Sequence, residues 1–293
     1  MNGLKLSRSG QASGSGQASG TPAKAGRRGR EWLYRRVLPP LLAVGLVVAG
    51  WEAVYLAGWR PSYVLPAPAE VLGRFVEQLA DAKFWAALAN TLVRASVGYG
   101  VSVLIGTAVG LLVSRSRLMR SAVGSLITGM QTMPSIAWFP FAILLFSLSE
   151  QAIIFVVVLG AAPSIANGLI SGIDDVAPAL LDTGRALGAR GFVLYRYVVL
   201  PAALPAYLAG LKQGWAFAWR SLMAGELLVI IASKPSLGVQ LQFFREFADT
   251  AGLLAMMLVI LLLGMAVDAA FSRITHRVQF KRGLYSPDAV PAR

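Results

Sequence analysis

The sequence has 293 residues, of which 56% are hydrophobic and only 14% are charged, and its mean hydropathy is +0.62. A soluble domain usually carries about 25% charged residues, so the composition excludes an ordinary soluble protein and predicts an all-α membrane protein. The net charge of +13 does not indicate a nucleic-acid partner, because the Lys and Arg residues gather beside apolar stretches, as they do in membrane proteins.

The N-terminal segment is polar and low in complexity. It repeats Gly-Gln-Ala-Ser-Gly at residues 10–14 and 16–20, and ends in the basic cluster Arg27, Arg28 and Arg30. Such a segment cannot bury enough apolar surface to offset the entropy of ordering it, so residues 1–30 are predicted to be a disordered, basic, cytoplasmic tail. The apolar run that follows has the length of a membrane span, which favours an uncleaved first helix over a signal peptide.

Six apolar segments are each about as long as a helix must be to cross a hydrocarbon core of about 30 Å. They are predicted at Val37–Ala57, Leu88–Val113, Ser121–Leu145, Glu150–Ile173, Leu204–Ile231 and Thr250–Ser272. Pro134 and Pro140 interrupt the third segment, so a kink is expected there. Gly106 and Gly110 in the second segment predict a face that packs closely against another helix.

Positive charge alternates between the connecting segments. The basic ones are Arg27–Arg36, Arg115–Arg120, Arg185–Arg196 and Arg273–Arg282. By the positive-inside rule these segments and both termini are cytoplasmic, and six spans return the chain to its starting side. Residues 31–87 are then the first membrane helix with an extracytoplasmic loop, residues 88–275 a core domain of five membrane helices, and residues 276–293 a basic cytoplasmic tail.

The cytoplasmic loop at residues 174–201 contains a short amphipathic pattern. Its apolar and small residues recur three or four positions apart, at Leu180, Leu181, Gly184, Leu187 and Gly188. Gly188 suits a left-handed helix cap, and Pro201 is expected to break the backbone before the fifth span. On physical grounds the pattern fits two structures equally: a helix lying on lipid headgroups, or an element that docks a soluble partner.

The spacing of this loop resembles the EAA loop of binding-protein-dependent ABC importer permeases, which reads Glu-Ala-Ala, three residues, Gly, nine residues, Ile-x-Leu-Pro. Gly188, Leu200 and Pro201 match that pattern, and Val198 replaces Ile. Asp182-Thr183-Gly184 stands in place of Glu-Ala-Ala, which keeps the acid but weakens the helix, since Gly costs about 1 kcal/mol relative to Ala.

In that family the loop is a coupling helix that sits in a cleft of the ATPase subunit. The resemblance therefore implies a coupling helix at Asp182–Ala189. It implies these ATPase contacts: Asp182, Thr183, Gly184, Ala186, Leu187, Gly188 and Ala189.

The resemblance extends over about Leu33–Leu284. Leu65–Val71 resembles the Leu-Pro-x-Pro-x-x-Val segment of the nitrate, sulfonate and taurine branch, and Leu211–Glu226 is similar to the fifth helix of that branch. It implies a six-transmembrane-helix, type I ABC importer permease fold with a cytoplasmic coupling helix, in the bacterial cell membrane. The implied partners are an ABC ATPase that binds ATP and Mg²⁺, an extracytoplasmic solute-binding protein, and a second copy of the chain.

Ionisable residues inside the spans are costly in lipid unless they are paired or hydrated. Lys212 and Asp268 both fall in the cytoplasmic half, where they are predicted to form a structural pair. Arg94, Arg220 and Glu226 fall in the outer half.

Two interpretations of the outer residues stay open. In the first they form structural ion pairs, with Arg220 about 9 Å along the helix from Glu226. In the second Arg94, Arg220 and Glu226 lie on the translocation path together with Trp219, and an arginine attracts an anion. Trp215 and Trp219, one turn apart, fill packing space more often than they bind a solute.

The sequence contains no feature of an enzyme. It lacks the G-x-x-x-x-G-K-[ST] phosphate loop, so ATP hydrolysis is expected from a partner ATPase. It has no cysteine and a single isolated histidine, His276, so no catalytic residue, metal ligand or cofactor is predicted in this chain.

The predicted function is translocation of a small oxyanion, in the sulfonate, taurine, nitrate or bicarbonate class. One alternative is an ABC permease for a non-anionic solute such as a thiamine precursor. Another is an ion-coupled secondary transporter, which predicts discontinuous helices with acids at the midplane; only Glu52 approaches that description. A membrane scaffold would explain the spans but not the loop spacing.

Overall fold

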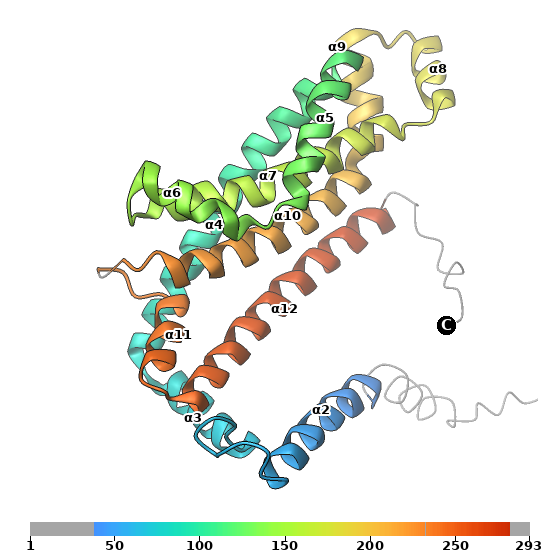
Figure 1. The fold of residues 1–293 in the computed structure, drawn as a ribbon. Coiled ribbons are helices and arrows are strands. Elements are labelled where there is room, and N and C mark those ends of the chain that lie inside the picture. Colours follow the sequence, from blue (N-terminus) through green and yellow to red (C-terminus); the bar gives the residue numbers. More distant parts are fainter. Residues whose placement is uncertain (1–37, 232, 282–293) are drawn as a thin grey trace, which may run out of the picture. The chain divides into compact units, whose positions relative to one another are not determined.

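A computed structural model describes residues 38–231 and 233–281, and every regular element in this part of the chain is a helix (Figure 1). Five of the described helices are long and apolar enough to cross a membrane, and a sixth span results if one bent pair of helices counts as a single span. This agrees with the six predicted spans. The predicted N-terminal tail, and the predicted C-terminal tail from residue 282 onward, lie outside the described residues.

The chain divides into two compact units, residues 1–58 and 59–293. In the first unit the described helix is α2 (Leu38–Leu56), which coincides with the first predicted span to within one residue. Pro39 and Pro40 lie in its first turn, where a missing amide hydrogen removes no helical hydrogen bond.

The core of the second unit consists of three long helices that lie side by side (Figure 1): α4 (Ala82–Ser114), α7 (Glu150–Asp174) and α10 (Leu200–Leu228). Glycine allows their backbones to approach closely. A Cβ atom on Gly168 of α7 would lie 2.5 Å from the Cα of Gly210 on α10, and one on Gly106 of α4 would lie 2.6 Å from the carbonyl oxygen of Ala162. The predicted close-packing face of the second span is thus confirmed, and it contacts α7.

The third predicted span is bent by 100°. It comprises α5 (Arg117–Thr132), the 3-10 helix η2 (Ser135–Trp138) and α6 (Phe139–Phe146). The break falls at Met133 and Pro134, where Met133 is extended, as residues before proline prefer to be. Pro140 does not interrupt a helix, because it lies in the first turn of α6. A kink was predicted here, and the observed bend is much sharper.

The cytoplasmic loop of the prediction contains α8 (Pro178–Ala186) and α9 (Gly191–Leu194), followed by a π-helical segment, η3 (Tyr195–Val199), that continues into α10. The prediction that Pro201 breaks the backbone is wrong, because the helix is continuous from Gly191 to Leu228. A π-helical turn just before Pro201 widens the helix where the proline ring would otherwise meet a preceding carbonyl group.

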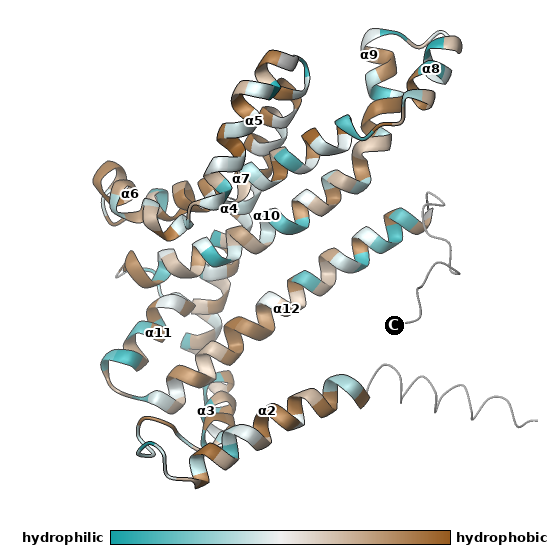
Figure 2. Cartoon of the chain, turned by 45° about the vertical axis from the view of Figure 1, so that its right-hand side comes forward, coloured by the Kyte–Doolittle hydropathy of each residue, from teal (hydrophilic) through white to brown (hydrophobic). Residues whose placement is uncertain are grey.

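The remaining helices of this unit are α3 (Pro68–Ala80), α11 (Leu237–Glu246) and α12 (Thr250–Lys281). α3 and α11 lie at one end of the unit, and α8 and α9 lie at the other (Figure 1). Pro68 begins α3 and is buried with Val71, which explains the proline-rich segment noted in the sequence. Figure 2 shows that α12 is hydrophobic over the part near α3 and becomes hydrophilic toward its C-terminal end.

Candidate functional site

A buried ion cluster joins three helices at the α11 end of the second unit. Arg94 of α4 donates from Nε and Nη2 to the two carboxylate oxygens of Glu150, both at 2.7 Å, and from Nη1 to Glu226 Oε1 at 2.5 Å. Glu150 is the first residue of α7, and Glu226 lies near the end of α10. The side chain of Arg94 is 4% exposed and that of Glu226 is fully buried, so the guanidinium group is enclosed by carboxylates.

The cluster extends to α11 and to the loop before it. Glu226 also accepts hydrogen bonds from Thr91 Oγ1 and from the backbone amide of Gly238, each at 3.0 Å. Lys234 Nζ lies 3.5 Å from Glu150 Oε1 and offsets the second negative charge. A buried charge is tolerated when it is paired and fully hydrogen-bonded, and both conditions hold here.

One of the two interpretations paired Arg220 with Glu226, but the structure pairs Glu226 with Arg94 instead. The two residues are six positions apart, about 600° around the helix, so they project from different faces of α10, whereas residues three or four apart are neighbours. Glu226 faces the interior and Arg94, while Arg220 is exposed. The Arg220 guanidinium lies 5.2 Å from the ring centroid of Phe217, and within the described part of the chain no carboxylate forms an ion pair with it.

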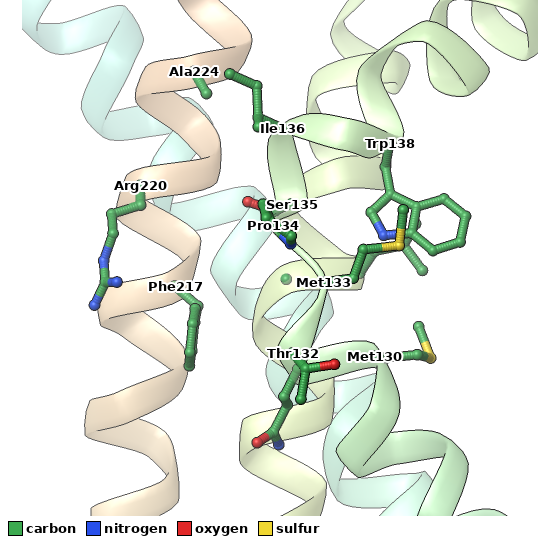
Figure 3. A pocket seen from close by; sticks show the side chains of 13 residues that line it. Met130, Thr132, Met133, Pro134, Ser135, Ile136, Trp138, Phe217, Arg220 and Ala224 are labelled. Carbon is green, nitrogen blue, oxygen red and sulfur yellow. The ribbon is translucent and has the colours of Figure 1, made fainter.

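A cavity of about 300 Å³ lies at the bend of the third span. Figure 3 shows Phe217, Arg220 and Ala224 on α10, opposite the break at Thr132–Ile136. The polar residues that line the cavity are Gln131, Thr132, Ser135 and Arg220. Ser221 of α10 donates a hydrogen bond to Ser135 of η2, with 2.8 Å between the hydroxyl oxygens. One permanent cation among neutral polar groups and apolar walls suits an anionic ligand.

Arg220 and Trp219 also border a second hollow. This apolar groove of about 800 Å³ lies between α10 and α12 and includes Trp215, Trp219 and Asp268. The rings of Trp215 and Trp219 are stacked, with centroids 6.1 Å apart. Four residues were candidates for the translocation path. Arg220 and Trp219 line the cavity or the groove, whereas Arg94 and Glu226 are buried in the interior.

The structure brings Lys212 and Asp268 together. Lys212 Nζ on α10 lies 3.2 Å from Asp268 Oδ1 on α12, and it also donates to Ser272 Oγ at 2.9 Å. Both side chains are about half-exposed. This pair joins α10 to α12 nearer the α8 end of the unit than the Arg94 cluster does.

The helix in the loop begins earlier than predicted. α8 spans Pro178–Ala186 instead of Asp182–Ala189, because Pro178 is suited to a first helical turn. Gly188 has φ +86°, and its amide and that of Ala189 donate to the carbonyl groups of Arg185 and Gly184. These bonds form a Schellman cap, which confirms the left-handed cap predicted for Gly188.

The predicted ATPase contacts occupy this helix and its cap. Asp182 pairs with Arg185 on the exposed surface at 3.0 Å, and Gly184 is buried. Leu187 is 83% exposed. The other predicted contacts, Thr183, Ala186, Gly188 and Ala189, are exposed or partly exposed.

The sequence did not predict Glu150, Thr91 and Lys234 as partners in the buried ion cluster around Arg94. Glu150 begins the fourth predicted span, and an acid at the end of an apolar helix signals a need for a partner. A second polar cluster was also missed at the α8 end. Its members are Ser114, Arg120, Asp174 and Tyr195.

Comparison with known proteins decides the family. Residues 102–280 match the family described as the binding-protein-dependent transport system inner membrane component. The chain belongs to this family. It is therefore a permease of an ABC importer and a multi-pass protein of the inner membrane, and the resemblance seen in the sequence is confirmed.

Several relatives come from the branch named in the sequence analysis. The putative aliphatic sulfonates transport permease SsuC of Escherichia coli (strain K12) is 30% identical over 82% of this chain and 90% of its own length. The taurine transport system permease TauC of the same organism is 26% identical over 87% of this chain and 94% of its own. The nitrate import permease NrtB of Synechocystis sp. (strain ATCC 27184 / PCC 6803 / Kazusa) is 25% identical over 66% of this chain and 73% of its own length.

Solved structures share the fold. The MetNI methionine ABC transporter in an inward-facing conformation aligns with a TM-score of 0.57 and 22% identity, covering 67% of this chain and 96% of that chain. A bacterial ABC transporter that imports alginate aligns with a TM-score of 0.59 and 12% identity, covering 85% and 93%. The fold is that of type I ABC importer permeases, and an ion-coupled secondary transporter is not favoured.

Proposed function

We propose that this permease translocates a small oxyanion of the sulfonate, taurine, nitrate or bicarbonate class. The observation that carries the proposal is Arg220, an exposed arginine that lines the cavity beside the break in the third span. Without a carboxylate partner among the described residues, it retains its N–H donors for an oxyanion, which accepts paired hydrogen bonds from arginine. The names of the sulfonate, taurine and nitrate relatives support the same class.

Arg94 and Glu226 have a different role in this proposal. The guanidinium group of Arg94 already donates to two carboxylates. Its charge is therefore neutralised, and it attracts an anionic solute only weakly. We assign this pair to the architecture of the bundle and Arg220 to the path. Trp219 borders the same part of α10, where its ring packs on Trp215.

The subunit is proposed to work as a homodimer with two ATPase subunits and an extracytoplasmic solute-binding protein. ATP and Mg²⁺ bind to the ATPase, and this chain supplies neither a catalytic residue nor a cofactor. Both termini and the α8 end face the cytoplasm, and α3 and α11 face outward. The exposed side chains of Leu180 and Leu187 support a docking role for α8, because its apolar face is only partly covered by this chain.

The anion contact is tested with Arg220→Gln. In proteoliposomes containing the complete transporter, uptake of taurine, ethanesulfonate or nitrate should fall about tenfold or more, because one charge-assisted hydrogen bond contributes about 1.5–3 kcal/mol. Assembly and basal ATP hydrolysis should stay normal. Arg273→Gln, an exposed arginine near the C-terminal end of α12, is the matched control and should transport normally. Normal anion uptake by Arg220→Gln would refute the assignment.

The ATPase contact is tested at Gly188. No atom lies within 4 Å of a Cβ placed on this residue, but its φ of +86° strains any L side chain. Gly188→Asn is therefore the control for backbone strain, since Asn adopts left-handed conformations most readily. Gly188→Trp should lose ATPase association while Gly188→Asn retains it. A helix lying on lipid headgroups predicts that both variants associate normally.

A further inference from the structure

The last residue of α4, Ser114, forms a hydrogen bond with Tyr195 at the start of η3. Their hydroxyl oxygens are 2.8 Å apart. Ser114 Oγ also donates to the carbonyl oxygen of Leu111 at 2.9 Å, and a serine hydroxyl has only one hydrogen. Tyr195 must therefore be the donor in this bond, and removal of its hydroxyl group would delete the bond.

Ser114 lies where several helix ends meet. Its carbonyl oxygen accepts from Arg120 Nη2 at 3.0 Å, and Arg120 forms an ion pair with Asp174. Arg120 is in the first turn of α5, and Asp174 is the last residue of α7. A displacement of Ser114 is thus shared by α4, α5 and α7.

Tyr195 lies between two residues that α8 approaches, Leu194 and Val198. A Cβ atom on Gly184 would lie 2.8 Å from Leu194 Cδ1 and 3.1 Å from Val198 Cγ2, so α8 contacts the helical turn that includes Tyr195. That turn is π-helical, and π-helical segments occur frequently at functional sites. Movement of α8 would be transmitted to this turn through direct side-chain contact.

We propose that Tyr195 is a positioning residue for transport: its hydrogen bond to Ser114 transmits the displacement of α8 to α4 and the core. The inference rests on the proposed function, in which α8 contacts the ATPase. The contact between α8 and η3 carries the first step, and the Tyr195–Ser114 bond carries the second. Tyr195 binds neither the solute nor the ATPase in this account.

The test measures solute imported per ATP hydrolysed in proteoliposomes that contain the complete transporter, with taurine as the solute. Tyr195→Phe keeps the ring and removes the hydroxyl group. Import per ATP should fall about two- to tenfold, the range that the loss of one hydrogen bond produces in an equilibrium. ATPase association should be normal. Ser114→Ala should give the same defect. Ser114→Thr keeps a hydroxyl group and should therefore retain normal import per ATP.

Tyr207 offers a matched control. Its hydroxyl group forms a 2.7 Å hydrogen bond with Thr107 of α4. Like Tyr195, it therefore joins the continuous helix Gly191–Leu228 to α4, but at a point farther from α8. Tyr207→Phe removes an equivalent bond and should leave import per ATP unchanged. A purely structural role for these bonds predicts equal effects of Tyr195→Phe and Tyr207→Phe, and that result would overturn the inference.

The failure of the inference is distinguishable from failure of the proposed function. If Gly188→Trp disrupts ATPase association while Tyr195→Phe couples normally, only the role of Tyr195 is refuted. Normal ATPase association of Gly188→Trp would refute the docking role of α8 itself. Loss of ATPase association in Tyr195→Phe would also overturn the inference, because Tyr195 would then act in docking.

Discussion

Arg94 and Glu226 are 132 positions apart in the sequence, and Arg94 Nη1 lies 2.5 Å from Glu226 Oε1 in the interior of the bundle. The pair joins the first half of α4 to the last turns of α10. Because Glu226 also accepts from the amide of Gly238 at 3.0 Å, the start of α11 is fixed to the same point. One ion pair therefore positions three helices.

Breaking this pair should be strongly destabilising. Glu226→Leu leaves a buried guanidinium group with one fewer carboxylate, and we expect a loss of about 3–5 kcal/mol, measured as thermal stability in detergent. Arg94→Met should cost a similar amount. The double variant should lose less than the sum of the two, and strictly additive losses would contradict the pairing. Glu77→Ala, which breaks an exposed pair with Arg74, is the control and should change stability by about 0.5 kcal/mol or less.

Lys212 and Asp268 should show a weaker version of the same coupling. Their side chains are about half-exposed, so a single neutral substitution leaves a charge that hydrates in part, at a cost of up to about 3 kcal/mol. Lys212→Leu with Asp268→Leu should recover part of the loss caused by either change alone. Folded yield and thermal stability measure this, and no recovery in the double variant would mean that the ion pair contributes nothing.

The contact between α7 and α10 should not tolerate a side chain at Gly168. A Cβ there would lie 2.5 Å from the Cα of Gly210, so Gly168→Ala must separate the helices, at a cost of about 1–3 kcal/mol. Gly124 in α5 has no atom within 4 Å of its Cβ position. Gly124→Ala should therefore be neutral or stabilising by up to about 1 kcal/mol. Equal melting temperatures for the two variants would show that the close approach is not limiting.

The proposed orientation can be tested with single cysteines, because the natural chain contains none. Ser62 and Arg277 are both exposed. A membrane-impermeant thiol reagent should label Ser62→Cys in intact cells and Arg277→Cys only after permeabilisation. Labelling of Arg277→Cys in intact cells would reverse the orientation of the C-terminal end.

Span positions could be predicted from the sequence because length and apolarity decide them locally. α2 and α7 match their predicted ranges to within one residue at each end. The helix and cap at Pro178–Ala189 could be located for a similar reason, since their residues are close in sequence. The continuous helix through Pro201 could not, because a π-helical turn that accommodates a proline has no signal in apolar periodicity.

The partners of the charged residues inside the spans could not be predicted from local sequence spacing. Arg94 binds residues 56 and 132 positions away, and no local spacing selects them. The pairing of Arg220 with Glu226 could have been rejected from sequence alone, since a six-residue separation places two side chains on different faces of a helix.

The glycine contact between α7 and α10 also provides a reference distance for studies of conformational change. Gly168 and Gly210 leave no room for the two helices to move closer, and moving them apart would lose the close packing of their backbones. Spin labels on the outward surfaces of α7 and α10 should therefore report the same separation in every nucleotide state. Label pairs that join either helix to α8 or α12 can be calibrated against that constant value, so that a change in their separation is assigned to the moving helix.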